Sequence, residues 1–248
     1  PARRPRAGRI PAPRLRADTN PKRKRGRVVD LPRLTLQVSV YGSSHSLRAT
    51  FMHTGKVFGI GLSRTGTRTL LAALNLIGVR TKWYPSDPTT YRELLSGKFD
   101  LTILTQYDAL TDTPVVPYYP QFDRIYSGSK FILTVRERES WLRSCEKHWT
   151  SFGFTGAEPP SAPFWRQFAC FIDSCVYGCH AFNRERFSSV YDTHVQNVQR
   201  YFEGRPQSLL TMNICGGEGW EVLCPYLDCD VPNTPFPHMD TFQSPLLR

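Results

Sequence analysis

Residues 56–71 read Lys-Val-Phe-Gly-Ile-Gly-Leu-Ser-Arg-Thr-Gly-Thr-Arg-Thr-Leu-Leu, and no other stretch says as much about this chain. The apolar run 57–60 predicts a buried strand, and the residues from Thr67 onward predict an amphipathic helix. Between them lies a loop, 61–66, that contains two glycines. A loop of this kind turns backbone N–H groups inward at the positive end of a helix, which suits a bound phosphate group.

The two glycines of the loop, Gly61 and Gly66, have the spacing of the Walker A motif, Gly-x4-Gly-Lys-[Ser/Thr]. The lysine of that motif reaches the β- and γ-phosphates of ATP or GTP, and here Thr67 takes its place. This replacement argues against a nucleoside triphosphatase. The positive charge lies inside the loop instead, at Arg64. From these residues alone, a strand-to-helix turn without a ligand stays open as an alternative.

A second informative segment begins at residue 130. Residues 130–135 form a continuous apolar, β-branched run, which is typical of a buried parallel strand. The run ends at Arg136, and Ser144 follows eight positions later within a helical pattern. Taken singly, Arg136 also fits a solvated loop residue and Ser144 a helix-surface position.

The segment 63–69, Ser-Arg-Thr-Gly-Thr-Arg-Thr, resembles the 5′-phosphosulfate loop of sulfotransferases that use 3′-phosphoadenosine-5′-phosphosulfate (PAPS). The usual form in that family is Pro-Lys-x-Gly-Thr-[Thr/Arg], so Arg64 stands at the position of the family's lysine. Arginine keeps the charge and adds a planar fork, but it cannot donate a proton. The family also has an Arg and a Ser at the spacing of Arg136 and Ser144, and this pair clamps the 3′-phosphate of the donor.

The resemblance covers roughly residues 56–240. Its C-terminal part, 219–227 and 231–238, is similar to a subgroup common in microbes and lower eukaryotes, and we expect a short helix and a proline-braced segment there. The resemblance implies a site for PAPS as co-substrate without a metal ion. It assigns the donor site to Ser63, Arg64, Thr65, Gly66, Thr67, Arg68, Arg136 and Ser144.

Strand and helix signals alternate from residue 56 onward, which predicts an α/β protein with a parallel sheet. With the resemblance, the expected architecture is a three-layer P-loop-type fold whose central parallel sheet is flanked by helices. Strands are expected at 57–60, 79–84, 100–105, 131–135 and 209–213, and helices near 67–77, 139–150, 163–180, 187–203 and 217–228. Ligands of such sheets bind at the carboxyl ends of the strands, where the loop and Arg136 both lie.

Sulfuryl transfer also needs a base for the acceptor's proton. In the sulfotransferases this base follows the strand that precedes the Arg-bearing one. Cytosolic members have His-Leu-Pro where this chain has Asp112-Thr-Pro, which nominates Asp112, with Asp108 second. With Arg64 these are the candidate catalytic residues. An aspartate has an ordinary pKa of about 3.9 and is a weak base unless it is buried, and capping of the turn before Pro114 stays open as an alternative.

The net charge of +11 belongs to one end of the chain. Residues 1–50 contain 13 Lys and Arg against two acidic residues, whereas residues 51–248 contain 19 of each sign. We therefore expect a basic, disordered extension, 1–50, and a sulfotransferase-like α/β domain, 51–248. The folded domain is not expected to bind nucleic acid. The extension fits a nuclear or organellar signal, a polyanion-binding arm or a solvated tail.

Other features bound the cellular context. No apolar run approaches the length of a membrane span, and no secretory signal is visible, so no membrane partner is expected. Three of the seven cysteines, Cys170, Cys175 and Cys179, follow an apolar helical pattern that predicts core thiols. The cysteine pattern favours a reducing compartment such as the cytoplasm. His148 and His180 also lie on helical patterns and are expected to pack in a partly buried setting.

These observations together predict transfer of a sulfuryl group from PAPS to a hydroxyl or amine of a small-molecule or glycan acceptor. The aromatic segment 149–165 is a candidate lid over the acceptor. Two rival functions remain open: a P-loop kinase acting on a nucleotide or small molecule, and a non-catalytic nucleotide-binding protein. The sequence does not indicate the identity of the acceptor or the oligomeric state.

Overall fold

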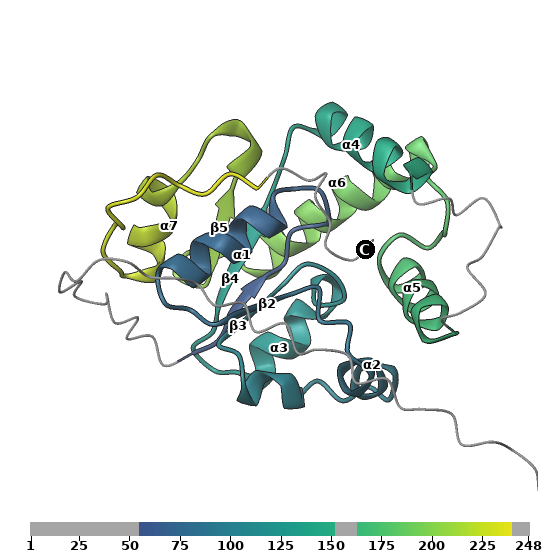
Figure 1. Ribbon diagram of the computed structural model, residues 1–248, viewed down its shortest axis with the longest axis horizontal. Helices are drawn as coiled ribbons and strands as arrows, with labels where there is room; N and C mark the ends of the chain where they lie inside the picture. Colours follow the sequence, from purple (N-terminus) through teal and green to yellow (C-terminus); the bar gives the residue numbers. More distant parts are fainter. Residues whose placement is uncertain (1–54, 152–162, 240–248) are drawn as a thin grey trace, which may run out of the picture. The chain divides into compact units, whose positions relative to one another are not determined.

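The computed structural model describes residues 55–151 and 163–239. Within them, five strands form one sheet in the order β2-β3-β1-β4-β5, and every neighbouring pair is parallel. The strands are β1 (Val57–Gly59), β2 (Thr81–Trp83), β3 (Ala109–Thr111), β4 (Lys130–Thr134) and β5 (Leu209–Met212). The predicted parallel α/β sheet is therefore confirmed, with β1 at its centre (Figure 1).

The connections between the strands carry the helices. These are α1 (Thr67–Leu76), α2 (Pro88–Leu95), α3 (Tyr119–Ile125), α4 (Arg138–Ser151), α5 (Pro163–Val176), α6 (Arg184–Tyr201) and α7 (Trp220–Leu227). Three short 3-10 helices, η1 (Thr102–Thr105), η2 (Val116–Tyr118) and η3 (Ile214–Gly216), complete the description. The lid segment proposed from the sequence lies largely in 152–162, outside the described residues. The basic extension, 1–50, also lies outside them.

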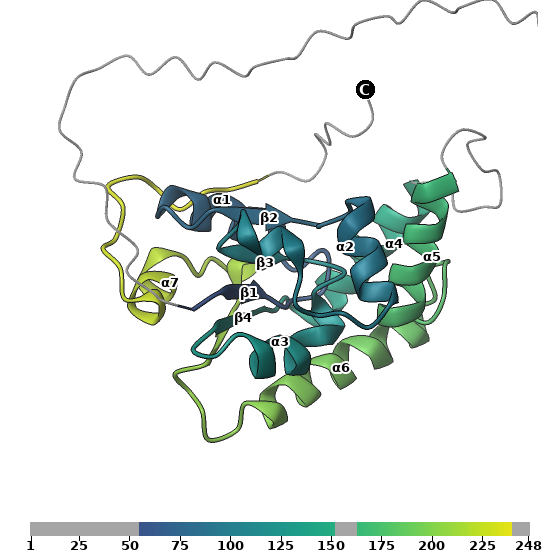
Figure 2. The same ribbon diagram turned by 90° about the horizontal axis from the view of Figure 1, so that it is seen from below.

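Helices cover both faces of the sheet because successive strand residues point to opposite sides. Val57 packs in one core with α1 and α7, whereas its neighbour Phe58 packs in a second core with α3 and α6. In Figure 2, α1 lies on one side of the strands and α3 and α6 lie on the other. The predicted three-layer architecture is confirmed.

A third apolar cluster closes the carboxyl end of the sheet. It joins α4, α5 and α6 to the glycine loop, because Leu62 of the loop packs among Trp141, Tyr177 and Phe187. The loop thus has an apolar underside held by three helices. Its polar atoms are left to face the carboxyl ends of the strands.

The C-terminal part of the described chain packs as the sequence predicted. Helix α7 contributes Trp220, Leu223 and Leu227 to the core on its side of the sheet. The segment after it is fastened by Phe236, whose ring meets Trp220 edge-on, and by Trp220 Nε1, which donates to the carbonyl of Thr234 at 2.9 Å. This region therefore braces one layer of the fold.

The strand predicted at 100–105 is wrong. Residues Thr102–Thr105 form η1, and the third strand is Ala109–Thr111. Leu101 and Leu104 are both buried, a three-residue spacing that suits a 3-10 turn better than a strand. All three residues of β3 are buried, so no alternation marks it in the sequence. Helix α2, which we did not predict, has a clear signal in its cap Asp87.

The cysteines of α5 also differ from expectation. Cys170 and Cys175 are exposed, and Cys179, which follows the helix, is half-buried. The buried side of this region is formed instead by Phe168 and Ile172, one turn apart, so the two cysteines turn outward. His180 is exposed as well, and it pairs with Asp173.

Candidate functional site

The glycine loop, 61–66, leaves β1 at the carboxyl edge of the sheet, and both of its glycines are required by geometry. A Cβ at Gly61 would collide with Thr134 of the neighbouring strand β4. Gly66 has a φ of 100°, in the left-handed region that glycine tolerates best. The hydroxyl of Thr65 bonds Thr134 Oγ1 at 2.6 Å, which pins the loop to β4. The loop is therefore held before any ligand arrives.

The start of α1 is open to a negative charge. Its N-cap is Gly66, which has no side chain to satisfy the first N–H groups, and the first turn contains no acidic residue. The N-terminus of a helix carries a partial positive charge and unpaired N–H donors. The predicted order of strand, glycine loop and helix is present here.

Two predicted cations and one predicted hydroxyl meet at this loop. Arg64 Nε donates to Ser144 Oγ at 3.1 Å, which joins the loop to α4 across 80 positions of sequence. Arg136 Nη1 donates to the carbonyl of Arg64 at 3.3 Å. The structure thus brings together three residues that the sequence could connect only through a family spacing.

Arg136 is oriented by two residues that the sequence analysis missed. Its Nε donates to Ser140 Oγ at 3.0 Å, and its peptide N–H donates to the hydroxyl of Tyr191 at 3.1 Å. Ser140 lies one helical turn after Arg136, so this spacing was available as a signal. Tyr191 comes from α6, and only the tertiary structure places it here.

Two positive charges lie close together at the loop. Burial lowers the pKa of Arg64 and the positive charge of Arg136 lowers it further, whereas the nearby charge of Asp112 raises it. Within the described residues, neither guanidinium forms a salt bridge. Two adjacent cations in a partly buried setting repel each other, and an anion with more than one negative charge would relieve this repulsion.

His148 lies on α4 one turn after Ser144 and is half-buried, as predicted. Burial, followed by the charge of Arg64, lowers its pKa to about 4. The imidazole is therefore neutral at pH 7 and adds no third positive charge to the site. Its ring meets Trp149 at a centroid distance of 5.1 Å.

Asp112 follows β3 directly and is only 2% exposed. Its Oδ1 accepts from Ser63 Oγ at 2.5 Å and from the N–H of Thr113 at 2.7 Å. Its Oδ2 accepts from Thr67 Oγ1 at 2.5 Å and from Trp83 Nε1 at 2.9 Å. With the Thr113 hydroxyl at 3.3 Å from Oδ1, five donors from the loop, the start of α1, β2 and its own turn converge on one carboxylate.

Ser63 lies in the glycine loop and Thr67 begins α1, so the carboxylate holds the loop and the start of the helix together. A proton would reach Asp112 most directly through one of these two hydroxyls.

Asp108, the second candidate base, lies elsewhere. It precedes β3 and therefore sits at the amino edge of the sheet, opposite the loop. It accepts from Arg80 Nε at 2.8 Å, and this bond lowers its pKa. Lys56 lies 3.9 Å away. Asp108 and Asp112 lie at opposite ends of β3, so only Asp112 lies beside the glycine loop. The position of Asp108 therefore gives no support to its nomination as a catalytic residue.

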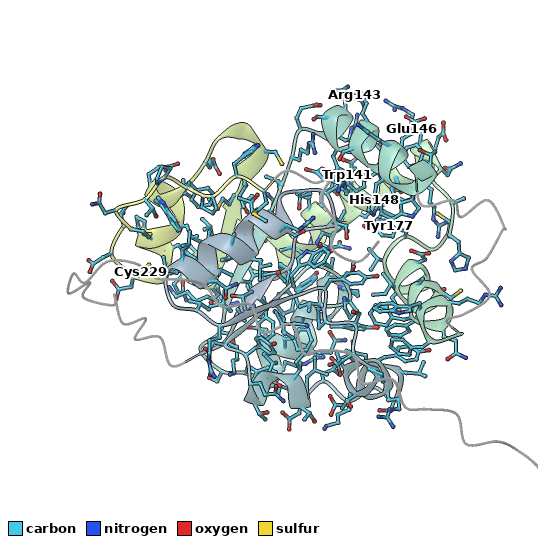
Figure 3. All side chains as sticks on the ribbon, in the orientation of Figure 1. Trp141, Arg143, Glu146, His148, Tyr177 and Cys229 are labelled. Carbon is cyan, nitrogen blue, oxygen red and sulfur yellow. The ribbon has the colours of Figure 1, made fainter. Side chains whose placement is uncertain are left out.

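Two tryptophans near the loop were not singled out in the sequence. Trp83 ends β2, donates to Asp112, and is covered by the guanidinium of Arg68 at 5.5 Å from its ring centroid. Trp141 Nε1 donates to the carbonyl of Ser63 at 2.9 Å. Figure 3 shows Trp141 with His148 and Tyr177 at this end of the molecule. The sequence could have indicated Trp83 as a site residue, because it lies at the carboxyl end of β2, where ligands of parallel sheets bind.

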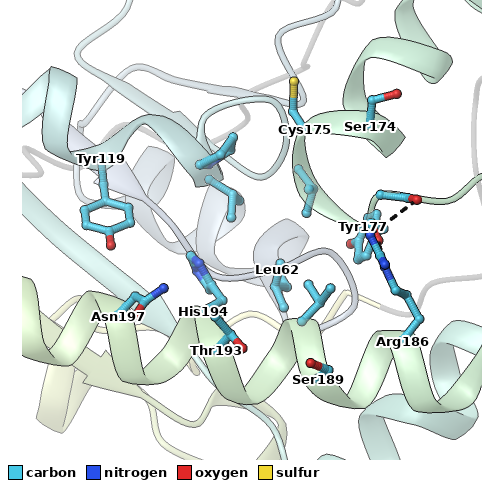
Figure 4. A pocket seen from close by; sticks show the side chains of 15 residues that line it. Leu62, Tyr119, Ser174, Cys175, Tyr177, Arg186, Ser189, Thr193, His194 and Asn197 are labelled. Carbon is cyan, nitrogen blue, oxygen red and sulfur yellow. Dashed lines mark hydrogen bonds between the residues drawn. The ribbon is translucent and has the colours of Figure 1, made fainter.

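A separate cavity of about 540 Å³ lies between α5, α6 and η2 (Figure 4). Leu62 of the loop contributes to its wall, but Arg64, Arg136 and Asp112 do not. The cavity therefore lies on the apolar underside of the loop and is distinct from the cationic site.

In residues 55–151 and 163–239, no three His, Cys, Asp or Glu side chains are grouped so that they could hold a metal ion. No helix in the same ranges is long and apolar enough to cross a membrane.

The fold and the site define a three-layer α/β protein with a cationic glycine loop at the carboxyl edge of its sheet. The family model described as the sulfotransferase domain matches residues 56–244, and the chain belongs to that family. This membership supports a sulfotransferase-type activity. The chain is also similar to "Ava biosynthesis cluster protein M" from Aspergillus versicolor, with 27% identity over 215 residues, 75% of this chain and 81% of the relative.

Proposed function

We propose that this protein transfers a sulfuryl group from PAPS to a hydroxyl or amine acceptor. The observation that carries the proposal is the meeting of Arg64, Arg136 and Ser144 at one glycine loop. PAPS has anionic groups at both its 5′ and its 3′ positions. Two guanidiniums that form no salt bridge with the described residues lie beside an open helix N-terminus, and they match such a ligand.

The residues divide between the two ends of the donor. Backbone N–H groups of Thr65, Gly66 and Thr67 would hold the 5′-phosphosulfate, and Arg64 would stabilise the charge that develops on the bridging oxygen. Arg136 and Ser144 would hold the 3′-phosphate. PAPS is the co-substrate that supplies the sulfuryl group, and no residue role proposed here requires a metal ion.

The transfer itself needs the acceptor's proton to leave. The acceptor oxygen or nitrogen forms a bond to sulfur while the bond from sulfur to the 5′-phosphate oxygen breaks. The acceptor's proton would pass to Asp112 through the hydroxyl of Ser63 or Thr67, because these hydroxyls occupy the carboxylate oxygens. The fungal relative is named for a biosynthesis cluster, which favours a small-molecule acceptor over a glycan.

The rival kinase function is less well supported. Thr67 stands at the Walker lysine position, and its hydroxyl is directed to Asp112. A non-catalytic nucleotide-binding protein would keep the cations and would also use the Asp112 network to hold the loop. Turnover of PAPS is therefore the measurement that separates this rival from the enzyme.

Nucleotide selectivity tests this proposal. We expect the protein to bind 3′-phosphoadenosine-5′-phosphate (PAP), the spent donor, at least about tenfold more tightly than ATP, without magnesium, since one lost charge-assisted hydrogen bond costs that much. Isothermal titration calorimetry with PAP, and with ATP in the presence and absence of magnesium, measures the difference. Magnesium-dependent ATP binding as strong as PAP binding would favour the kinase.

Deletion of the basic extension is a second test. A chain that begins at Thr54 is expected to keep the same thermal unfolding midpoint and PAP affinity. The reason is that residues 51–248 have no net charge and contain every proposed site residue. Thermal denaturation and PAP titration of both chains provide the comparison. Loss of PAP binding in a folded, truncated chain would place part of the site in the extension.

A further inference from the structure

Arg68 lies where a positive charge is unfavourable. It is the second residue of α1, at the end of the helix that carries a partial positive charge. The residue is half-buried, and its side chain forms no salt bridge or hydrogen bond with another described residue. An anion bound beside Arg68 would offset this repulsion.

The guanidinium of Arg68 is held in one place by Trp83. Its central carbon, Cζ, lies over the indole ring at 5.5 Å from the ring centroid. Trp83 is itself fixed, since its Nε1 donates to Asp112 Oδ2 at 2.9 Å. Stacking uses the flat face of a guanidinium, whereas its N–H donors lie in its plane. These donors therefore remain available to a planar ligand that accepts two hydrogen bonds, such as a carboxylate.

Arg68 and the proposed clamp for the 3′-phosphate lie on opposite sides of the glycine loop. The loop follows β1, and Figure 2 shows β2 and β3 on one side of β1 and β4 on the other. Arg136 follows β4 and contacts Arg64 there. Asp112 follows β3, and Trp83 ends β2. The 3′-phosphate end of the donor would therefore lie away from Arg68, which leaves the side of β2 and β3 for the acceptor.

The proposed path of the acceptor's proton begins next to Arg68. Thr67, the preceding residue, donates to Asp112 Oδ2 at 2.5 Å, and Trp83 Nε1 also reaches the Thr67 hydroxyl at 3.4 Å. An acceptor whose hydroxyl approaches Thr67 would thus lie against the stacked pair of Arg68 and Trp83. Asp112 is not the partner of Arg68, because both of its oxygens already accept from other donors.

We propose that Arg68 determines acceptor specificity by binding a carboxylate, so that the acceptor is a small hydroxy acid. This inference rests on the proposed function and adds the class of its acceptor. One carboxylate matches one guanidinium in charge, and without Arg68 the carboxylate would be repelled by Asp112 and by the donor. The alternative partner of Arg68 is the 5′-phosphate of the donor, as the family resemblance implies.

Acceptors that differ by one charge test the proposal. Each of a set of small aromatic and aliphatic hydroxy acids is paired with its methyl ester, and transfer from labelled PAPS gives kcat/KM for both. The wild-type protein should prefer the acid at least about tenfold, the scale of one charge-assisted hydrogen bond. Arg68→Gln should lower kcat/KM for the acid about tenfold or more and change it for the ester less than about twofold, since the ester lacks the charge.

Three controls separate the acceptor contact from other effects. Arg68→Lys keeps the charge but loses the planar fork, so it should keep part of the preference for the acid. Arg80→Gln removes the same charge from the residue before β2, where Arg80 bonds Asp108 at 2.8 Å, and should leave the preference unchanged. For Arg68→Gln, calorimetry should show PAP affinity within about threefold of wild type, because neither end of the donor loses a proposed contact. Its thermal unfolding midpoint should stay the same or rise, because a cation leaves the positive end of α1.

Three results would overturn the inference. A large loss of PAP affinity in Arg68→Gln, with an unchanged ratio of acid to ester, would make Arg68 a ligand of the donor and leave the proposed function intact. The same holds if the wild-type protein binds PAP but sulfates esters as readily as acids, or neither binds nor sulfates any acid of the set. If the wild-type protein does not bind PAP, the proposed function fails, and the inference fails with it.

Discussion

Asp112→Asn is expected to slow single-turnover sulfuryl transfer by about 10²- to 10⁴-fold, the range for removal of a general base. An amide cannot take the acceptor's proton. It also turns an N–H₂ group toward at least two of the five donors that now converge on the carboxylate, from Ser63, Thr67, Trp83 and the N–H and hydroxyl of Thr113. We therefore expect PAP affinity to fall as well, because the bracing of the loop is lost.

The stability of the Asp112→Asn protein should change in parallel. Burying an unmatched donor opposite another donor costs about 1–3 kcal/mol of unfolding free energy. Chemical denaturation measures this loss, and transfer is measured with labelled PAPS and an acceptor found by screening. Asp108→Asn is the control, since Asp108 lies at the amino edge of the sheet, and its transfer rate should change by less than about threefold.

Comparison of the Asp112→Asn and Asp108→Asn proteins decides which aspartate is the general base. A normal transfer rate for Asp112→Asn, with slow transfer for Asp108→Asn, would exchange the two assignments. If both variants transfer normally, the base lies outside this segment. His148, which is neutral at pH 7 beside Arg64, would then be the next residue to test.

Arg136→Ala is expected to weaken PAP binding by roughly 2–3 kcal/mol, about 30- to 150-fold, the scale of a lost charge-assisted contact. The guanidinium is held toward the loop by Ser140 and by the carbonyl of Arg64. Adenosine 5′-phosphosulfate, which lacks the 3′-phosphate, should lose little affinity. Titration of both nucleotides against both proteins gives the comparison.

Arg138→Ala is the matched control for this clamp. Arg138 lies two positions away but forms an exposed pair with Asp192 at 2.9 Å, and exposed pairs contribute little. Its PAP affinity should remain that of the wild type. Equal losses for PAP and adenosine 5′-phosphosulfate in Arg136→Ala would show that Arg136 does not contact the 3′-phosphate.

Local sequence determined the centre of this protein. The strand, the two glycines and the helix over residues 57–76 follow from hydrophobic pattern and backbone sterics, which act between near neighbours. The apolar run before Arg136 is equally local, and both predictions were confirmed as β1, α1 and β4. The strand predicted at 100–105 was wrong because β3 is three residues long and buried on both faces, too short to show a period.

Only the tertiary structure decided which side chains meet. The contacts from Arg64 to Ser144 and from Ser63 to Asp112 join residues that are 80 and 49 positions apart. Pattern within a segment carries no information about such partners, because they depend on strand order and on which edge of the sheet each segment reaches. Strand order placed β3 next to β1, and therefore Asp112, at the carboxyl end of β3, beside the loop. Asp108 lies at the other end of the same three-residue strand and so at the opposite edge of the sheet. Helix packing against the underside of the loop placed Leu62 among Trp141, Tyr177 and Phe187.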